Sequence, residues 1–204
     1  MHLVPTQEEV VALLEQAGAL RSGHFEYPSG LHASEHLQVP LAMRYYQHAK
    51  TLSVGLSRLV RANPEIRAII PALSIVTPAT GGLPVAYGVC EALRAHQVYW
   101  AEPENGSGAL RFRQFLEQVR GEKVLLVDDL LRTGAKLSEL KQLVEANGAE
   151  VVGLAVLVWQ PAPDGPDFGS LPFYYLAKLG GIFHQDAASC DLCKRGVPAV
   201  KVRV

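Results

Sequence analysis

The chain has 204 residues, of which 49% are hydrophobic, and its 19 basic and 20 acidic residues give a formal net charge of -1 at pH 7. This length suits one α/β domain, and the balanced charge gives no electrostatic case for binding nucleic acid or an anionic membrane. There is no apolar run near the roughly 18 residues of a membrane span and no signal-peptide pattern, so we expect a cytoplasmic protein.

The first 39 residues are predicted to form one helix followed by irregular or short-stranded chain. Thr6 and Glu9 have the spacing of a capping box, and apolar residues at helical spacing follow as far as Gly18. Residues 21–39 have no sustained period, and turn-forming residues gather around Ser29 and Gly30.

Residues 40–100 are predicted to contain helix, strand, helix and strand in that order. Pro40 can begin one long helix that ends at Asn63, before a proline. Strand-forming residues follow within 66–76, a second helix is predicted over 85–93, and a short strand over 98–100.

The most informative segment lies near the middle of the chain. Residues 124–127 are four consecutive apolar residues, typical of a strand buried on both faces, and Asp128 and Asp129 follow at its end. A helical apolar pattern over 137–148 and a second strand over 151–158 complete a βαβ unit. Ligands in open α/β sheets bind at such strand ends.

The order of chemical groups in this segment fits a sugar phosphate. Adjacent carboxylates can hold sugar hydroxyls, or Mg²⁺ that a phosphorylated ligand brings. Backbone N–H groups at the following helix start can bind a phosphate, over Arg132, Thr133, Gly134, Ala135 and Lys136. Neither the dinucleotide-binding glycine pattern nor a Walker P-loop is present. The alternative is that the two aspartates only cap a helix and begin a turn.

A second candidate anion site precedes the helix over 85–93. Two glycines let the backbone approach a ligand closely, in the loop Pro78, Ala79, Thr80, Gly81 and Gly82. Two anion sites with a carboxylate pair between them suit phosphoribosyl pyrophosphate, which carries phosphate at one end and pyrophosphate at the other. The alternative is an ordinary strand-to-helix turn.

The segment 124–134 resembles the signature of the phosphoribosyltransferase family, a hydrophobic strand followed by two acidic residues and a Thr/Gly-rich phosphate loop. Three further segments resemble orotate phosphoribosyltransferases. Residues 24–32 are similar to their N-terminal region, residues 77–84 to their pyrophosphate loop, and residues 166–169 with 190–198 to the C-terminal part of one bacterial branch.

The resemblance implies an α/β, type I phosphoribosyltransferase-like fold, with a central, mainly parallel sheet flanked by helices. It implies a single domain over 1–204, with a core at about 40–160 and a hood built from the terminal segments at about 1–39 and 167–204. It also implies a homodimer, in which a loop of one subunit covers the site of the other. The apolar surface of the predicted long helix points the same way.

The resemblance also implies the activity, which is Mg²⁺-dependent transfer of ribose 5-phosphate from phosphoribosyl pyrophosphate to a nucleobase, releasing pyrophosphate. Orotate, the base used in pyrimidine biosynthesis, is favoured. Asp128 and Asp129 would be the catalytic pair, holding the ring hydroxyls and contacting Mg²⁺ indirectly or through the ligand. Ser29, Gly30 and Gln160 would contact the base.

Three positions depart from the family pattern. Arg132 and Lys136 replace hydroxyl residues of the phosphate loop, and both replacements are cationic. Gln160 stands where orotate enzymes commonly have an arginine that faces the carboxylate of the base, and a neutral amide cannot form that ion pair. We therefore expect slow turnover of orotate unless other residues, such as Arg132 or Lys136, have taken over these roles.

The loop over 102–108 lacks the basic residue that the orotate branch extends over the pyrophosphate, although Arg111 and Arg113 follow it and could substitute. These departures leave two alternatives open. The chain could be a catalytically weakened regulator that binds phosphoribosyl pyrophosphate or a nucleotide, or a phosphoribosyltransferase for a different base.

The three cysteines, an odd count, do not suggest a secreted disulfide scaffold. Cys190 and Cys193 could be structural thiols, a redox pair, or half of a metal site that His184 or a second subunit completes.

The histidines at 24, 32 and 36 have no metal-binding spacing, and we expect them at the surface or packed in the hood.

Overall fold

A computed structural model describes residues 3–106, 108–113, 116, 119–161 and 168–202. Of the sequence motifs considered above, Pro166 and Asp167 lie outside the described residues, as does Ser107 of the loop over 102–108. None of the helices within the described part of the chain is long and apolar enough to span a bilayer.

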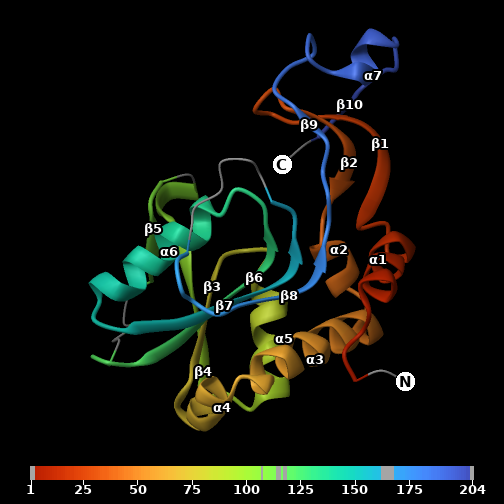
Figure 1. Cartoon of the computed structure of the whole chain (residues 1–204). Coiled ribbons are helices and arrows are strands. Elements are labelled where there is room, and N and C mark those ends of the chain that lie inside the picture. Colours follow the sequence, from red (N-terminus) through yellow and green to blue (C-terminus); the bar gives the residue numbers. More distant parts are fainter. Residues whose placement is uncertain (1–2, 107, 114–115, 117–118, 162–167, 203–204) are drawn as a thin grey trace.

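A six-stranded sheet forms the centre of the molecule (Figure 1). Five strands run parallel and the edge strand β5 pairs antiparallel with β4. In spatial order the strands are β5 (Leu110–Phe112), β4 (Gln97–Pro103), β3 (Ser74–Pro78), β6 (Lys123–Leu131), β7 (Glu150–Trp159) and β8 (Phe173–Lys178). The predicted fold class, a mainly parallel sheet flanked by helices, is confirmed.

Helices cover both faces of this sheet. On one face pack α1 (Gln7–Gln16), α3 (Tyr46–Ala62) and α5 (Leu83–Leu93), and on the other packs α6 (Ala135–Ala146). Side chains of β6 alternate between the two layers. Leu125 and Val127 belong to the apolar cluster of the first face, whereas Val124 and Leu126 belong to that of the second. The sequence prediction that this strand is buried on both faces is confirmed.

The N-terminal capping box is confirmed. The side chain of Thr6 accepts a hydrogen bond from the backbone N–H of Glu9, and the carboxylate of Glu9 accepts one from the N–H of Thr6 at 2.8 Å. Gly18, just beyond the helix, has φ of +65°, a conformation that favours glycine after a helix end.

The prediction of one long helix from Pro40 is wrong. The chain forms α2 (Pro40–Met43) and then α3, because Tyr45 adopts an extended conformation with φ of -92° and ψ of 118°. No glycine or proline marks this break, and the apolar period runs through it, so the pattern resembled one helix.

The strand predicted over residues 66–76 is wrong in its first part. That part forms α4 (Pro64–Ile69) and a 3₁₀ turn (Ile70–Ala72), and β3 begins only at Ser74. The side chain of Asn63 caps α4 by accepting hydrogen bonds from two backbone N–H groups, one of them Glu65 N at 2.9 Å. This cap overrides the strand preference of the isoleucines that follow.

A second, four-stranded sheet stands over one end of the molecule and is built from both terminal segments (Figure 1). We call it the hood. Its strands are, in spatial order, β10 (Val200–Lys201), β1 (Leu20–Glu26), β2 (His32–Leu37) and β9 (Phe183–His184), and the short helix α7 (Asp191–Lys194) lies beside them. The prediction that residues 21–39 are short-stranded is therefore correct for β1 and β2.

Candidate functional site

The acidic pair lies near the carboxyl end of β6, and the strand continues through Leu130 and Leu131 rather than ending at the pair as the sequence suggested. The apolar residues of β6 fix this strand between the two layers of helices. Asp128 is buried and Asp129 is partly buried. The carboxylate of Asp128 accepts a hydrogen bond from the backbone N–H of Asp129 at 2.9 Å. The buried strand thus holds two carboxyl groups rigidly at the edge of the sheet where ligands of this architecture bind.

Burial and mutual repulsion make the charged form of this pair costly. Desolvation, with the charge of Asp129 as the next cause, raises the pKa of Asp128 well above its usual value. Desolvation also raises the pKa of Asp129, although hydrogen bonds and Lys136 oppose this rise. Two carboxyl groups with raised pKa values in one recess are suited to a cation or a group that develops positive charge.

The loop after β3 packs directly against the acidic pair. A Cβ atom added to Gly81 would lie 3.0 Å from Oδ2 of Asp129, and one added to Gly82 would lie 2.7 Å from Oδ1 of Asp128. Gly82 is buried, and α5 begins at the next residue. Glycine is needed at both positions because any side chain would push the loop away from the carboxylates.

A pocket of about 1230 Å³ opens at this edge of the sheet. It brings together several groups that the sequence separates. Its lining includes Pro78, Ala79, Thr80 and Gly81 of the loop, both aspartates, and Lys136. A cavity of this size accommodates a ligand larger than a single phosphate.

The hairpin of β4 and β5 adds charged residues to the same pocket. Arg111 pairs with Glu104 at 3.1 Å, Arg113 forms an ion pair with Glu102, and both arginines are exposed. Of these four residues, Glu102, Arg111 and Arg113 line the pocket, and Glu104 does not. The two arginines considered as substitutes for the missing loop cation are therefore positioned at the site.

The predicted phosphate loop forms the turn between β6 and α6. Gly134 adopts a left-handed conformation with φ of +71°, and α6 begins at Ala135. Thr133 is exposed at this helix start, where the first backbone N–H groups have no partner within the helix. Lys136 lines the pocket next to the loop, whereas the side chain of Arg132 points elsewhere.

Arg132 reaches across to Gln160 and the hood. Its Nε donates a hydrogen bond to Oε1 of Gln160 at 2.9 Å, and its guanidinium lies 5.4 Å and 5.2 Å from the ring centroids of Tyr27 and Phe183. Among the described residues it has no carboxylate within ion-pair distance. Position 160 has no arginine, but the guanidinium of Arg132 lies beside the Gln160 side chain, where the side chain of that arginine would begin.

The remaining predicted base contacts lie apart from the pocket lining. Gln160 is buried, and its backbone N–H donates to the carbonyl of Leu131 at 2.8 Å. Ser29 and Gly30 are exposed at the tip of the β1–β2 hairpin. Sequence reasoning missed Tyr27 and Phe183, because nothing in their local pattern indicates that their rings meet Arg132.

Comparison with known proteins gives a consistent picture. Residues 72–169 match the model of the phosphoribosyl transferase domain. The chain is 33% identical to an orotate phosphoribosyltransferase of Desulforamulus reducens, over 96% of this chain and 95% of that protein. It is also 33% identical to one of Thermotoga maritima, over 93% and 94%. In structure it resembles the orotate phosphoribosyltransferase of Aeropyrum pernix, with a TM-score of 0.66 and 22% identity over 83% of this chain and 93% of that one.

Proposed function

We propose, from the premise that this chain belongs to the phosphoribosyltransferase family and is a phosphoribosyltransferase, that it transfers ribose 5-phosphate from phosphoribosyl pyrophosphate to orotate. The observation that carries this proposal is the acidic pair, with Asp128 buried and Asp129 partly buried, in a pocket that is also lined by the loop after β3 and by Lys136 in the first turn of α6. The names of the relatives support orotate as the base. The three free cysteines fit a reducing, cytoplasmic compartment.

In this proposal, each of the two turns binds one of the anionic groups of phosphoribosyl pyrophosphate. The start of α6, with Thr133, Gly134 and Ala135, is suited to the 5-phosphate, because free N–H groups and the helix dipole favour an anion there. The loop Pro78–Gly82 is suited to the pyrophosphate. The ribose ring then lies over the acidic pair, where Asp128 and Asp129 accept hydrogen bonds from its hydroxyls.

Breaking the bond to pyrophosphate builds positive charge on the ribose ring, as in glycoside cleavage. The aspartates place negative charge beside that ring in a partly desolvated recess, where electrostatic stabilisation is strong. Asp128 and Asp129 also fit Mg²⁺, since two carboxylates together with ligand phosphates are its usual partners. Mg²⁺, when bound, neutralises charge on the pyrophosphate.

Arg111 and Arg113 are proposed to hold the departing pyrophosphate. Both side chains are exposed. Arg113 is paired with Glu102, which lines the pocket, and Arg111 is paired with Glu104, which does not. Exposed ion pairs are worth only about 0.2–1 kcal/mol, so a polyanionic ligand can readily replace the glutamates as their partner.

Arg132 is proposed to bind the carboxylate of orotate. The side chain of Gln160 holds Nε of the guanidinium, and the rings of Tyr27 and Phe183 fix its plane. The terminal nitrogens of the guanidinium can then make a bidentate contact with a carboxylate. The cation that binds the carboxylate of the base would then be supplied by Arg132, the residue directly after β6, and not by position 160.

A homodimer is also proposed, supported by exposed aromatic side chains on adjacent helices. Tyr46 at the start of α3 is 70% exposed and Tyr87 on α5 is 54% exposed, and these helices pack together. Light scattering at micromolar concentration should give twice the chain mass, and a monomer would contradict the dimer.

The decisive experiment is a pyrophosphate-release assay with phosphoribosyl pyrophosphate, Mg²⁺ and a panel of nucleobases. Release with orotate alone supports the proposal, and release with another base identifies a different transferase. Tight binding of phosphoribosyl pyrophosphate by calorimetry, with no release for any base, would instead support a binding or regulatory protein.

A further inference from the structure

Four potential metal ligands converge in the hood, outside the pocket described above. His24 lies on β1 and His32 on β2, Cys190 directly precedes α7, and Cys193 lies within it. One ligand atom from each residue lies within 4.8 Å of all the others. The two histidines and Cys190 are buried and Cys193 is partly buried.

The distances among these atoms match a tetrahedral metal site. Nε2 of His24 lies 3.5 Å from Sγ of Cys190 and 3.6 Å from Sγ of Cys193. Nδ1 of His32 lies 3.5 Å from Sγ of Cys193. Around a tetrahedral zinc ion, sulfur at about 2.3 Å and nitrogen at about 2.0–2.1 Å stand about 3.5 Å apart. The two ring nitrogens are 2.9 Å apart, and small ring rotations would separate them to the tetrahedral distance.

A hydrogen bond outside the cluster fixes the tautomer of His24. Nδ1 lies 2.7 Å from the backbone oxygen of Val197, and since a carbonyl only accepts, this nitrogen must carry the proton. In the neutral ring Nε2 then presents a lone pair to both sulfurs and to His32. Metal-bound histidines usually donate their second N–H to such an oxygen.

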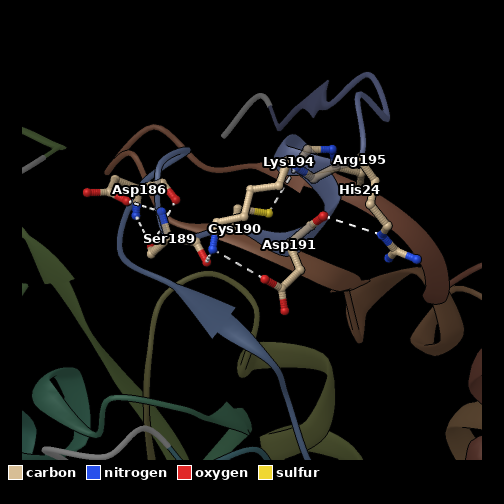
Figure 2. Close-up of polar contacts among 7 residues, drawn as sticks. All are labelled: His24, Asp186, Ser189, Cys190, Asp191, Lys194 and Arg195. Carbon is tan, nitrogen blue, oxygen red and sulfur yellow. Dashed lines mark hydrogen bonds and ion pairs between the residues drawn. The ribbon is translucent and has the colours of Figure 1, made fainter.

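The chain around the cysteines is held in place before any metal binds. The backbone N–H of Ser189 donates to the carboxylate of Asp186 at 2.7 Å, which fixes the turn leading into Cys190. After Cys193, Lys194 and Arg195 contact the side chain and the backbone oxygen of Asp191. Figure 2 shows these contacts, together with the dashed line between the Cys190 sulfur and His24.

We propose that His24, His32, Cys190 and Cys193 bind one structural Zn²⁺ ion that fastens the C-terminal segment to the β1–β2 hairpin. Two thiolates and two imidazoles form one of the common structural zinc sets, and this soft set disfavours Mg²⁺ and Ca²⁺. Four protein ligands leave no open position, so the ion stabilises the fold and takes no substrate.

The proposed site takes up one of the three sequence alternatives for the cysteine pair, half of a metal site, but with different completing ligands. The completing ligands are His24 and His32, far away in the chain, whereas His184 is the strand partner of His32 across β2 and β9. A second subunit is not needed to complete four ligands. The inference does not rest on the proposed transferase activity, because it concerns a different part of the molecule.

The first test uses the wild-type chain, purified without a histidine tag and dialysed against metal-free buffer. Mass spectrometry of metals should find about one zinc ion per chain. After the zinc is replaced by Co²⁺, the absorption spectrum should show the visible bands of tetrahedral cobalt and a thiolate-to-cobalt charge-transfer band. A reduced protein that binds neither ion, or a cobalt spectrum without the charge-transfer band, would overturn the proposal.

The second test compares Cys193→Ser with Cys90→Ser. Cys90 lies on α5, packs against the apolar cluster of the first face and donates a hydrogen bond to the backbone oxygen of Ala95. Loss of a residue that only hydrogen-bonds a metal ligand already weakens metal affinity by about 10–100-fold, so Cys193→Ser, which removes a ligand itself, should weaken zinc affinity by at least about that factor. Cys90→Ser should retain full occupancy. Equal zinc content in the two variants would show adventitious binding and overturn the site. If Cys193→Ser does not fold, the cobalt spectrum of the wild type decides.

Discussion

Gly82 lies so close to the carboxylate of Asp128 that a Cβ atom at this position would come within 2.7 Å of Oδ1. The same atom would collide with the hydroxyl of Thr77 on β3. The predicted anion loop and the acidic pair are therefore one closely packed unit, and a change in either one moves the other.

Gly82→Ala should displace the loop after β3 and lower kcat/KM for pyrophosphate release by about 100-fold, since misplacement by about 1 Å can cost this much. Gly180→Ala is a matched control, because a Cβ there meets no atom within 4 Å. Wild-type kinetics of the Gly82→Ala enzyme would show that the loop after β3 does not take part in the reaction.

Asp128→Asn should raise the melting temperature while abolishing activity. The raised pKa of Asp128 means that the folded state binds more protons than the unfolded state, so this residue makes the fold less stable as pH rises above the unfolded pKa. Single stabilising substitutions commonly add about 0.5–2 kcal/mol to the free energy of unfolding. A gain of that size would raise the melting temperature by a few degrees, at about 2–4 °C per kcal/mol.

Calorimetric melting of Asp128→Asn across pH 5–8 checks this sign. The difference in melting temperature between Asp128→Asn and the wild type should grow as pH rises. The exposed control Glu15→Gln should melt like the wild type throughout. A lower melting temperature for Asp128→Asn at neutral pH would show that the carboxylate stabilises the fold.

Arg132→Met should raise the KM for orotate by about one to two powers of ten, because a hydrogen bond to a charged group is worth about 1.5–3 kcal/mol. The KM for phosphoribosyl pyrophosphate, which Arg132 does not contact in the proposed arrangement, should change little. Lys178→Met, which removes a cation 4.2 Å from the Trp159 ring, is the control. An equal rise in the KM values of both substrates would assign Arg132 to the 5-phosphate instead.

Glu102→Gln should strengthen binding of phosphoribosyl pyrophosphate by a few-fold, because it frees Arg113. Hydrogen bonds from Arg113 and Trp100 keep the pKa of Glu102 low, so this glutamate is ionised and competes with the ligand at neutral pH. Glu145→Gln breaks an ion pair with Lys141 on α6 and serves as control. Calorimetric titration measures both, and weaker binding by Glu102→Gln would contradict the competition.

Stripping the zinc ion with a chelator should lower the melting temperature by several degrees and raise the KM for orotate more than that for phosphoribosyl pyrophosphate. The reason is that His32 pairs with His184 next to Phe183, whose ring contacts Arg132, whereas the acidic pair belongs to the central sheet. Zinc-loaded and stripped protein with the same melting curve would show that no ion supports the hood.

The features that the sequence predicted correctly depend on short-range patterns. The capping box of Thr6 and Glu9, the doubly buried β6 and the turn before α6 each follow from a few adjacent residues. The hidden features depend on tertiary contacts. The direction of Arg132 is set by rings from both ends of the chain, and Cys190 meets His24 across 166 positions. No local spacing encodes such pairs.

The pairing of β10 with β1, and of β9 with β2, sets the order in which the hood can be completed during synthesis. The hairpin β1–β2 leaves the ribosome well before its two edge partners, and contacts between such distant segments form slowly. The central sheet, with its aspartates and both anion turns, is complete once β8 has emerged. A nascent chain at that stage carries the turn proposed to bind phosphate but lacks Phe183, so the proposed base contact of Arg132 can form only after β9 has been synthesised.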